Sequence, residues 1–189
     1  MLPYIWLARG LYKVSLSGTD NEDFKNAYKD AISALGKGIK YDLKETDGAI
    51  ISEHSEFIEL FQKSLFEIID NELTSGSAQK AYGWAVRYNK ITQNESGIKY
   101  VMGVCKYKAE DKTTARSLWQ EADEILKTVE SIQTWSEADK SMLKIGILRS
   151  AAALNESRQQ DKARELLNKV AQWFENDDDW KARYDEIIN

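Results

Sequence analysis

The 189-residue chain contains one cysteine (Cys105), one proline (Pro3) and one histidine (His54). A single cysteine excludes an internal disulfide and leaves the redox compartment open. A catalytic Ser-His-Asp or Cys-His arrangement would have to use His54, and one histidine with no cysteine nearby is a poor metal site. The ten glycines are scattered and form no phosphate-binding loop. We therefore expect no enzyme, no metal and no cofactor.

Two further absences restrict the partners and the compartment. The formal net charge is -5, the isoelectric point is about 5.1, and no basic stripe stands out, which argues against a nucleic-acid partner. No apolar run approaches the roughly 20 residues that span a bilayer, so membrane insertion is not expected. No charged leader precedes a cleavable apolar segment, and an apolar helical pattern starts at once with Trp6 and Leu7. We expect a segment of a longer chain, in a compartment that stays undetermined.

What the sequence does contain favours helix throughout. Hydrophobic residues make up 42% and charged residues 30%, as in a globular domain. Ser136, with Asp139 three residues later, is typical of a helix start. Apolar spacing predicts helices at about 3–17, 21–36, 53–73, 77–91, 95–109, 112–130, 136–158, 160–175 and 178–188. Between them, Gly36 and Gly38 predict a stop, and residues 37–52 are predicted to be irregular, as an insertion or as a functional loop.

Small residues recur where paired helices would cross closely. Gly103 and Ala115 are twelve residues apart, and Ala151 and Ala163 have the same spacing. Ala81 precedes Ala115 by 34 residues. A period of 34 with two helices per unit, small residues at the crossings and aromatic residues beside them resembles the tetratricopeptide repeat.

The resemblance implies an all-α, right-handed array of antiparallel helical hairpins in a single domain covering 1–189. The implied hairpins are at about 3–36, 53–91, 95–130 and 136–175, with a capping helix at about 178–188. The alanines at 27, 81, 115 and 163 are separated by 54, 34 and 48 residues, so only one interval fits the family without insertions. A generic helical bundle or another helical repeat is the alternative.

In tetratricopeptide arrays the first helix of each unit lines a concave groove. In this sequence a Tyr-Lys pair recurs in two such helices, as Tyr12-Lys13 and Tyr107-Lys108. We predict a partner-binding surface at Tyr12, Lys13, Tyr100, Tyr107, Lys108 and Asn155. Alternatively, the tyrosines pack between helices with their hydroxyls at the rim. The function that the resemblance implies is a non-enzymatic scaffold that binds a protein or peptide partner. The alternative is an assembly segment that stacks on further repeats or forms a homo-oligomer.

Overall fold

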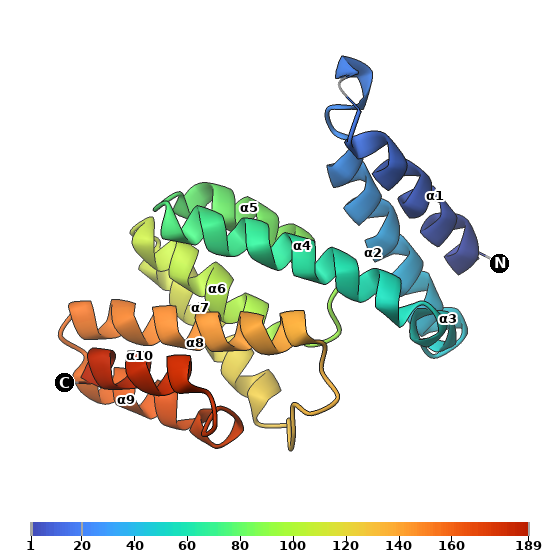
Figure 1. Cartoon of the computed structure of the whole chain (residues 1–189). Coiled ribbons are helices and arrows are strands. Elements are labelled where there is room, and N and C mark those ends of the chain that lie inside the picture. Colours follow the sequence, from blue (N-terminus) through green and yellow to red (C-terminus); the bar gives the residue numbers. More distant parts are fainter. Residues whose placement is uncertain (1, 20, 189) are drawn as a thin grey trace.

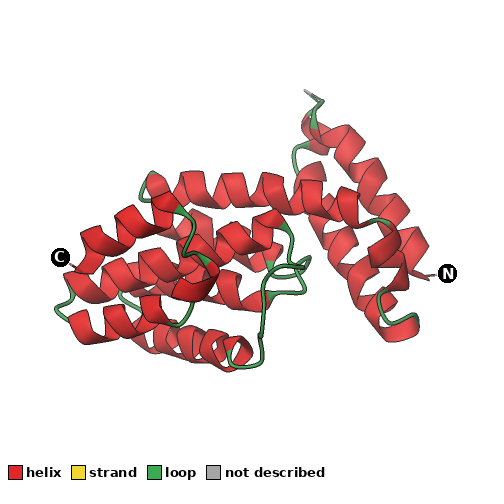
Figure 2. Ribbon diagram, turned by 60° about the horizontal axis from the view of Figure 1, so that its bottom comes forward, coloured by secondary structure: helices red, strands yellow, loops and turns green. Residues whose placement is uncertain are grey.

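The computed structural model describes residues 2–19 and 21–188, and over these ranges every element is helix or loop (Figures 1 and 2). The all-α prediction is therefore confirmed for the described residues. They form α1 (Leu2–Ser17), the 3-10 turn η1 (Glu22–Phe24), α2 (Ala27–Glu45), α3 (Ala49–Glu53), α4 (Ser55–Thr74), α5 (Ala78–Tyr88), α6 (Glu95–Lys108), α7 (Lys112–Leu126), α8 (Glu137–Glu156), α9 (Gln160–Asn168), η2 (Ala171–Trp173) and α10 (Asp178–Ile188).

The prediction of an irregular stretch at 37–52 is wrong. Helix α2 runs through Gly36 and Gly38 to Glu45, and α3 follows after a short turn. A glycine costs a helix interior only about 1 kcal/mol, which packing can offset. Gly38 packs against α1, where an added Cβ would be 3.3 Å from Leu7 Cδ2. The turn into α3 is held by the buried carboxylate of Asp42, which accepts a hydrogen bond from the Ile51 amide at 2.7 Å.

The N-terminal pair, α1 and α2, packs side by side and is joined to the rest of the chain through α4 and α5 (Figure 1). Gly10 of α1 lies against Leu35 of α2. On the other side of α2, the Tyr28 ring stacks on Phe61 of α4 at 5.6 Å, and the Tyr28 hydroxyl donates to Ser64 at 2.9 Å. These contacts extend one hydrophobic core from α1 to α6.

The remaining helices form the pairs α4–α5, α6–α7 and α8–α9, and α10 covers α8 and α9. Helix α8 also contacts α4 and α6, so it lies at the centre of this part of the molecule (Figure 1). At the α6–α8 crossing, an added Cβ on Gly97 would be 2.5 Å from the Leu143 nitrogen. Glycine therefore lets the two backbones touch.

The small residues expected at helix crossings, Gly103, Ala115 and Ala163, are all buried. Ala115 and Ala163 are fully buried, and Gly103 of α6 faces the Trp119 ring of α7. At the end of the chain, α10 inserts the buried Trp180, whose ring stacks on Phe174 at 5.1 Å. Within the described residues, no helix combines the length and apolar character that a membrane crossing requires.

Candidate functional site

The predicted partner-binding residues lie on three helices: Tyr12 and Lys13 in α1, Tyr100, Tyr107 and Lys108 in α6, and Asn155 near the end of α8. Helix α1 packs on α2, whereas α6 packs on α5, α7 and α8 (Figure 1). The structure therefore does not bring the two Tyr-Lys pairs together. Lys13 lies 3.8 Å from the Asp30 carboxylate of α2.

Tyr100 and Tyr107 do meet, in a cleft of about 230 Å³ lined by α6, α7, α9 and the end of α8. The Tyr107 ring stacks on Trp119 at 5.3 Å, and its hydroxyl donates to Ser157 at 2.8 Å. The Tyr100 hydroxyl donates to Asp123, and burial together with this contact raises the pKa of Tyr100 far above its usual value. Both hydroxyls are already paired within the chain, so these side chains join helices.

The other two predicted positions are more open. Lys108 is exposed at the last residue of α6. Asn155 is half-buried and lines a shallow hollow between α8 and α10 beside Arg183 and Glu186. Neither residue belongs to the aromatic cleft of α6 and α7.

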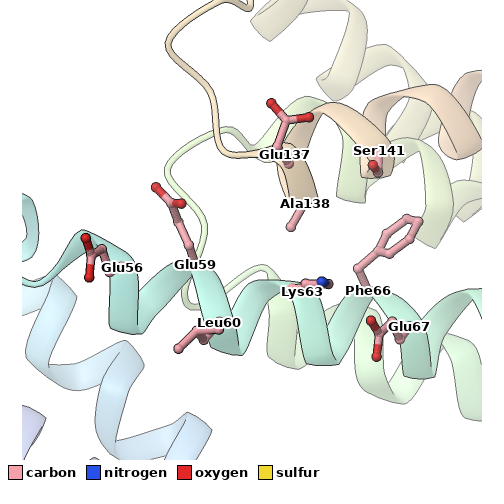
Figure 3. A pocket seen from close by; sticks show the side chains of 9 residues that line it. All are labelled: Glu56, Glu59, Leu60, Lys63, Phe66, Glu67, Glu137, Ala138 and Ser141. Atoms are coloured by element: carbon pink, nitrogen blue, oxygen red, sulfur yellow. The ribbon is translucent and has the colours of Figure 1, made fainter. Parts of the chain in front are cut away.

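A different cleft, of about 550 Å³, opens between α4 and the start of α8 (Figure 3). We call it the α4–α8 cleft. Phe66 points from α4 toward α8, and Ala138 points back from α8 (Figure 3). Leu60 is 67% exposed and points from α4 away from Ala138 (Figure 3). The complete lining is Glu56, Glu59, Leu60, Lys63, Phe66, Glu67, Glu137, Ala138 and Ser141.

The rim of the α4–α8 cleft is acidic. Among the residues that the structure describes, Glu56, Glu59 and Glu67 take part in no ion pair within 4.0 Å, while Glu137 is paired with Lys140 at 2.7 Å. Lys63 also lines the cleft, so its lining carries four carboxylates and one ammonium group. Apolar side chains interspersed with these carboxylates favour a ligand with apolar and cationic groups.

A buried carboxylate fixes the α8 wall of this cleft. Ser136 caps α8 and accepts from the Asp139 amide at 3.1 Å, which confirms the predicted helix start. The Asp139 carboxylate is 3% exposed and accepts hydrogen bonds from the Tyr88 hydroxyl at 2.7 Å, the Thr92 hydroxyl at 2.8 Å and the Asn94 side chain at 2.9 Å. Burial and this carboxylate raise the pKa of Tyr88 far above its usual value. Asp139 thus ties α5 and the loop after it to α8.

The same cluster reaches the α4 wall. The Ser136 hydroxyl donates to Gln62 Oε1 at 2.8 Å, and Gln62 Nε2 donates to the Ile91 carbonyl at 3.1 Å. Gln62 is buried although it is polar. Hydrogen bonds within the chain therefore fix the two walls of the cleft relative to each other.

Sequence reasoning missed this cleft because its two walls are more than 60 residues apart in the chain. One signal was available. Leu60 is apolar but falls outside the buried stripe of α4, which contains Ile58, Phe61 and Leu65. An apolar side chain beside glutamates on the exposed face of a helix is typical of a contact surface.

Cys105 is 2% exposed, and burial raises the pKa of its thiol to about 12. Because the thiolate is the reactive form, we expect this thiol to react slowly with Ellman's reagent near neutral pH and rapidly in urea. A Ser117→Cys variant supplies the control, since Ser117 is exposed on α7 and its new thiol should react at once. Fast reaction of Cys105 in the folded wild-type chain would contradict the buried placement.

No group of three or more His, Cys, Asp or Glu side chains is placed to hold a metal ion within residues 2–19 and 21–188. Comparisons of the chain with protein-family models, with characterised proteins and with solved structures found no match. The function is therefore argued from the geometry and charge of the site itself.

Proposed function

We propose that this chain is a non-enzymatic protein-binding module whose α4–α8 cleft receives an amphipathic helix with basic side chains. The observation that carries the proposal is an open cleft in which apolar side chains lie among three carboxylates that have no ion-pair partner in the described part of the chain. Helix-in-groove recognition uses such a surface, with apolar anchors in the groove and charges at its rim.

In the proposed complex, apolar side chains contribute affinity and charged side chains contribute specificity. The apolar face of the bound helix covers Leu60 and Phe66 of α4 and Ala138 of α8, which contributes affinity through removal of apolar surface from water. Its lysines or arginines approach Glu56 and Glu59, which contribute specificity and a faster association rate.

The tetratricopeptide-like arrangement is part of this proposal. Its support is the three consecutive helix pairs α4–α5, α6–α7 and α8–α9, with Gly103, Ala115 and Ala163 at or near their crossings. A contact between α4 and α8, which belong to non-consecutive pairs, departs from a regular array and forms the cleft. The second candidate function, assembly of the chain with further copies, is favoured by the exposed apolar face of α1.

The test is a binding titration with a fluorescein-labelled amphipathic helical peptide made of leucine, alanine and lysine. We expect it to bind, whereas a matched peptide with glutamate in place of lysine should not. Reversal of two rim charges, in the variant Glu56→Lys with Glu59→Lys, should weaken binding about tenfold, which is about 1.4 kcal/mol. Fluorescence anisotropy measures both affinities.

The control has the same change in net charge away from the cleft. Glu130 and Asp161 are exposed and do not line it, so Glu130→Lys with Asp161→Lys should leave the affinity within about twofold of wild type. Equal weakening by both double variants would mean that the peptide senses net charge alone, and equal binding of the lysine and glutamate peptides would contradict the proposal.

A further inference from the structure

Helix α1 has a second apolar face that points away from the protein. Its inner side, with Leu7 and Gly10, is buried against α2. On the outer side, Ile5 is 55%, Leu11 51% and Tyr12 61% exposed. We call this surface the outer face of α1, and its members, spaced three and four residues apart, are Leu2, Ile5, Ala8, Leu11 and Tyr12. Tyr4 is not one of them, because its hydroxyl donates to Glu53 at 3.5 Å and its ring packs edge-on to His54. An exposed apolar stripe of this length marks a contact surface.

The charge of α1 is opposite to that of the chain. Its only charged residues are Arg9 and Lys13, so the helix carries +2 in a protein of net charge -5. Arg9 lies one helical turn from both Ile5 and Tyr12, and Lys13 lies one turn beyond Arg9. The Arg9 guanidinium lies 5.3 Å from the Trp6 ring centroid. The outer face of α1 is therefore an apolar stripe with Arg9 along one edge, followed by Lys13, which lies 3.8 Å from Asp30 of α2.

We infer that the outer face of α1 in one copy of this chain occupies the α4–α8 cleft of a second copy. This inference rests on the proposed function, because it names the occupant of the same cleft. The two surfaces complement each other in charge: Arg9 of α1 and, in the cleft, Glu56, Glu59 and Glu67 have no ion-pair partners among the described residues, and the cleft contains one cation, Lys63. Their shapes also match, because α1 is a single convex helix and the cleft is an open groove.

The spacing of the charges fits as well. Arg9 and Lys13 are separated by a rise of roughly 6 Å along α1, and Glu56 and Glu59 by roughly 4.5 Å along α4. One helix laid along the other can therefore offer Arg9 a carboxylate, and Lys13 can exchange its contact with Asp30 of α2 for a second one. The docking helix needs no folding on arrival, because α1 is already held in helical form by α2.

The complementarity favours a head-to-tail contact over a symmetric one. In a two-fold dimer formed by α1 with itself, Arg9 would face the same helix of the other copy, which contains no acid. A head-to-tail contact leaves one free α1 and one free cleft at the ends of every assembly. The assembly therefore gains further copies as the protein concentration rises and does not stop at two copies.

The experiment uses two full-length variants, each with one surface blocked. The first, Ile5→Glu with Tyr12→Glu, places acids on the outer face of α1. The second, Glu59→Lys with Leu60→Lys, places cations in the cleft. All four positions are exposed, so folding should be retained, and circular dichroism checks it. Mass is measured by light scattering after size-exclusion chromatography over a range of concentrations.

We expect the wild-type chain to increase in mass with concentration and each variant alone to stay at the 21.6 kDa of one chain. A mixture of the two variants keeps one intact α1 face and one intact cleft, so it should form a one-to-one complex of about twice that mass. A monomeric wild type, a mixture that stays monomeric, or a cleft variant that still associates through α1 alone would each overturn the inference.

The outcome separates this inference from the proposed function. The α1 variant keeps an intact cleft, so it should bind the leucine-alanine-lysine peptide as a monomer. Peptide binding without association of the two variants would refute the second copy as occupant while leaving the cleft as a helix-binding site. Absence of both would refute both.

Discussion

Replacing Asp139 by leucine should lower the free energy of unfolding by about 3–5 kcal/mol, measured by urea denaturation followed by circular dichroism. The Asp139 carboxylate accepts from Tyr88, Thr92 and Asn94 while almost fully buried. Leucine leaves these donors without an acceptor in a space that excludes solvent. It also removes the link between α8 and the α5–α6 loop.

Two controls make this prediction specific. Asp185 is exposed on α10, and Asp185→Leu should change stability by no more than about 0.5 kcal/mol. Tyr88→Phe alone should cost about 1–3 kcal/mol and should cost less in a chain that already carries Asp139→Leu, because the hydroxyl then has no acceptor to lose. Additive effects of the two substitutions would contradict the direct hydrogen bond.

Replacing Gly97 by alanine should lower the free energy of unfolding by about 1–3 kcal/mol. The added Cβ would lie 2.5 Å from the nitrogen and 2.7 Å from the Cα of Leu143. Both atoms belong to the α8 backbone, so no side chain can rotate away, and the two helices must separate. The melting temperature and the urea midpoint should both fall.

Gly83 of α5 is the matched control for Gly97. An added Cβ there would meet only the Arg87 side chain, at 3.7 Å. Gly83→Ala should therefore raise stability by about 0.5–1 kcal/mol, because alanine is the better helix former. Equal responses of the two glycines would mean that α6 and α8 do not touch at Gly97.

Most helices after residue 53 were predicted to within about four residues because their apolar spacing is regular. The helix predicted at 160–175 is wrong at its end, because α9 ends at Asn168 and the 3-10 turn η2 follows. The sequence also identified Gly103, Ala115 and Ala163 as buried residues, since small side chains fit where helices pack closely.

The prediction that a helix ends at Gly36 and Gly38 is wrong, because α2 continues through both residues to Glu45. In the structure Gly38 lets α1 approach closely, and Gly36 does the same for Lys90 of the α5–α6 loop. Whether a glycine ends a helix or allows a close contact depends on these neighbours, which the local sequence does not show.

The site was harder to predict than the helices. The spacing of Tyr100 and Tyr107 placed both on α6 but did not say that they face α7 and α9. Asp139 cannot be told from a surface acid in a chain with 31 acidic residues, because its burial depends on donors some 45–51 residues away. The α4–α8 cleft likewise depends on two segments that only the tertiary fold brings together.

The central claim is that the α4–α8 cleft is the binding surface, and an NMR titration tests it most directly. The monomeric variant with Ile5→Glu and Tyr12→Glu, labelled with nitrogen-15, is titrated with the leucine-alanine-lysine peptide. We predict that the largest amide shifts fall in residues 56–67 of α4 and 137–141 of α8. Shifts concentrated in residues 100–119 and 162–169, around the aromatic cleft of α6 and α7, would contradict the claim.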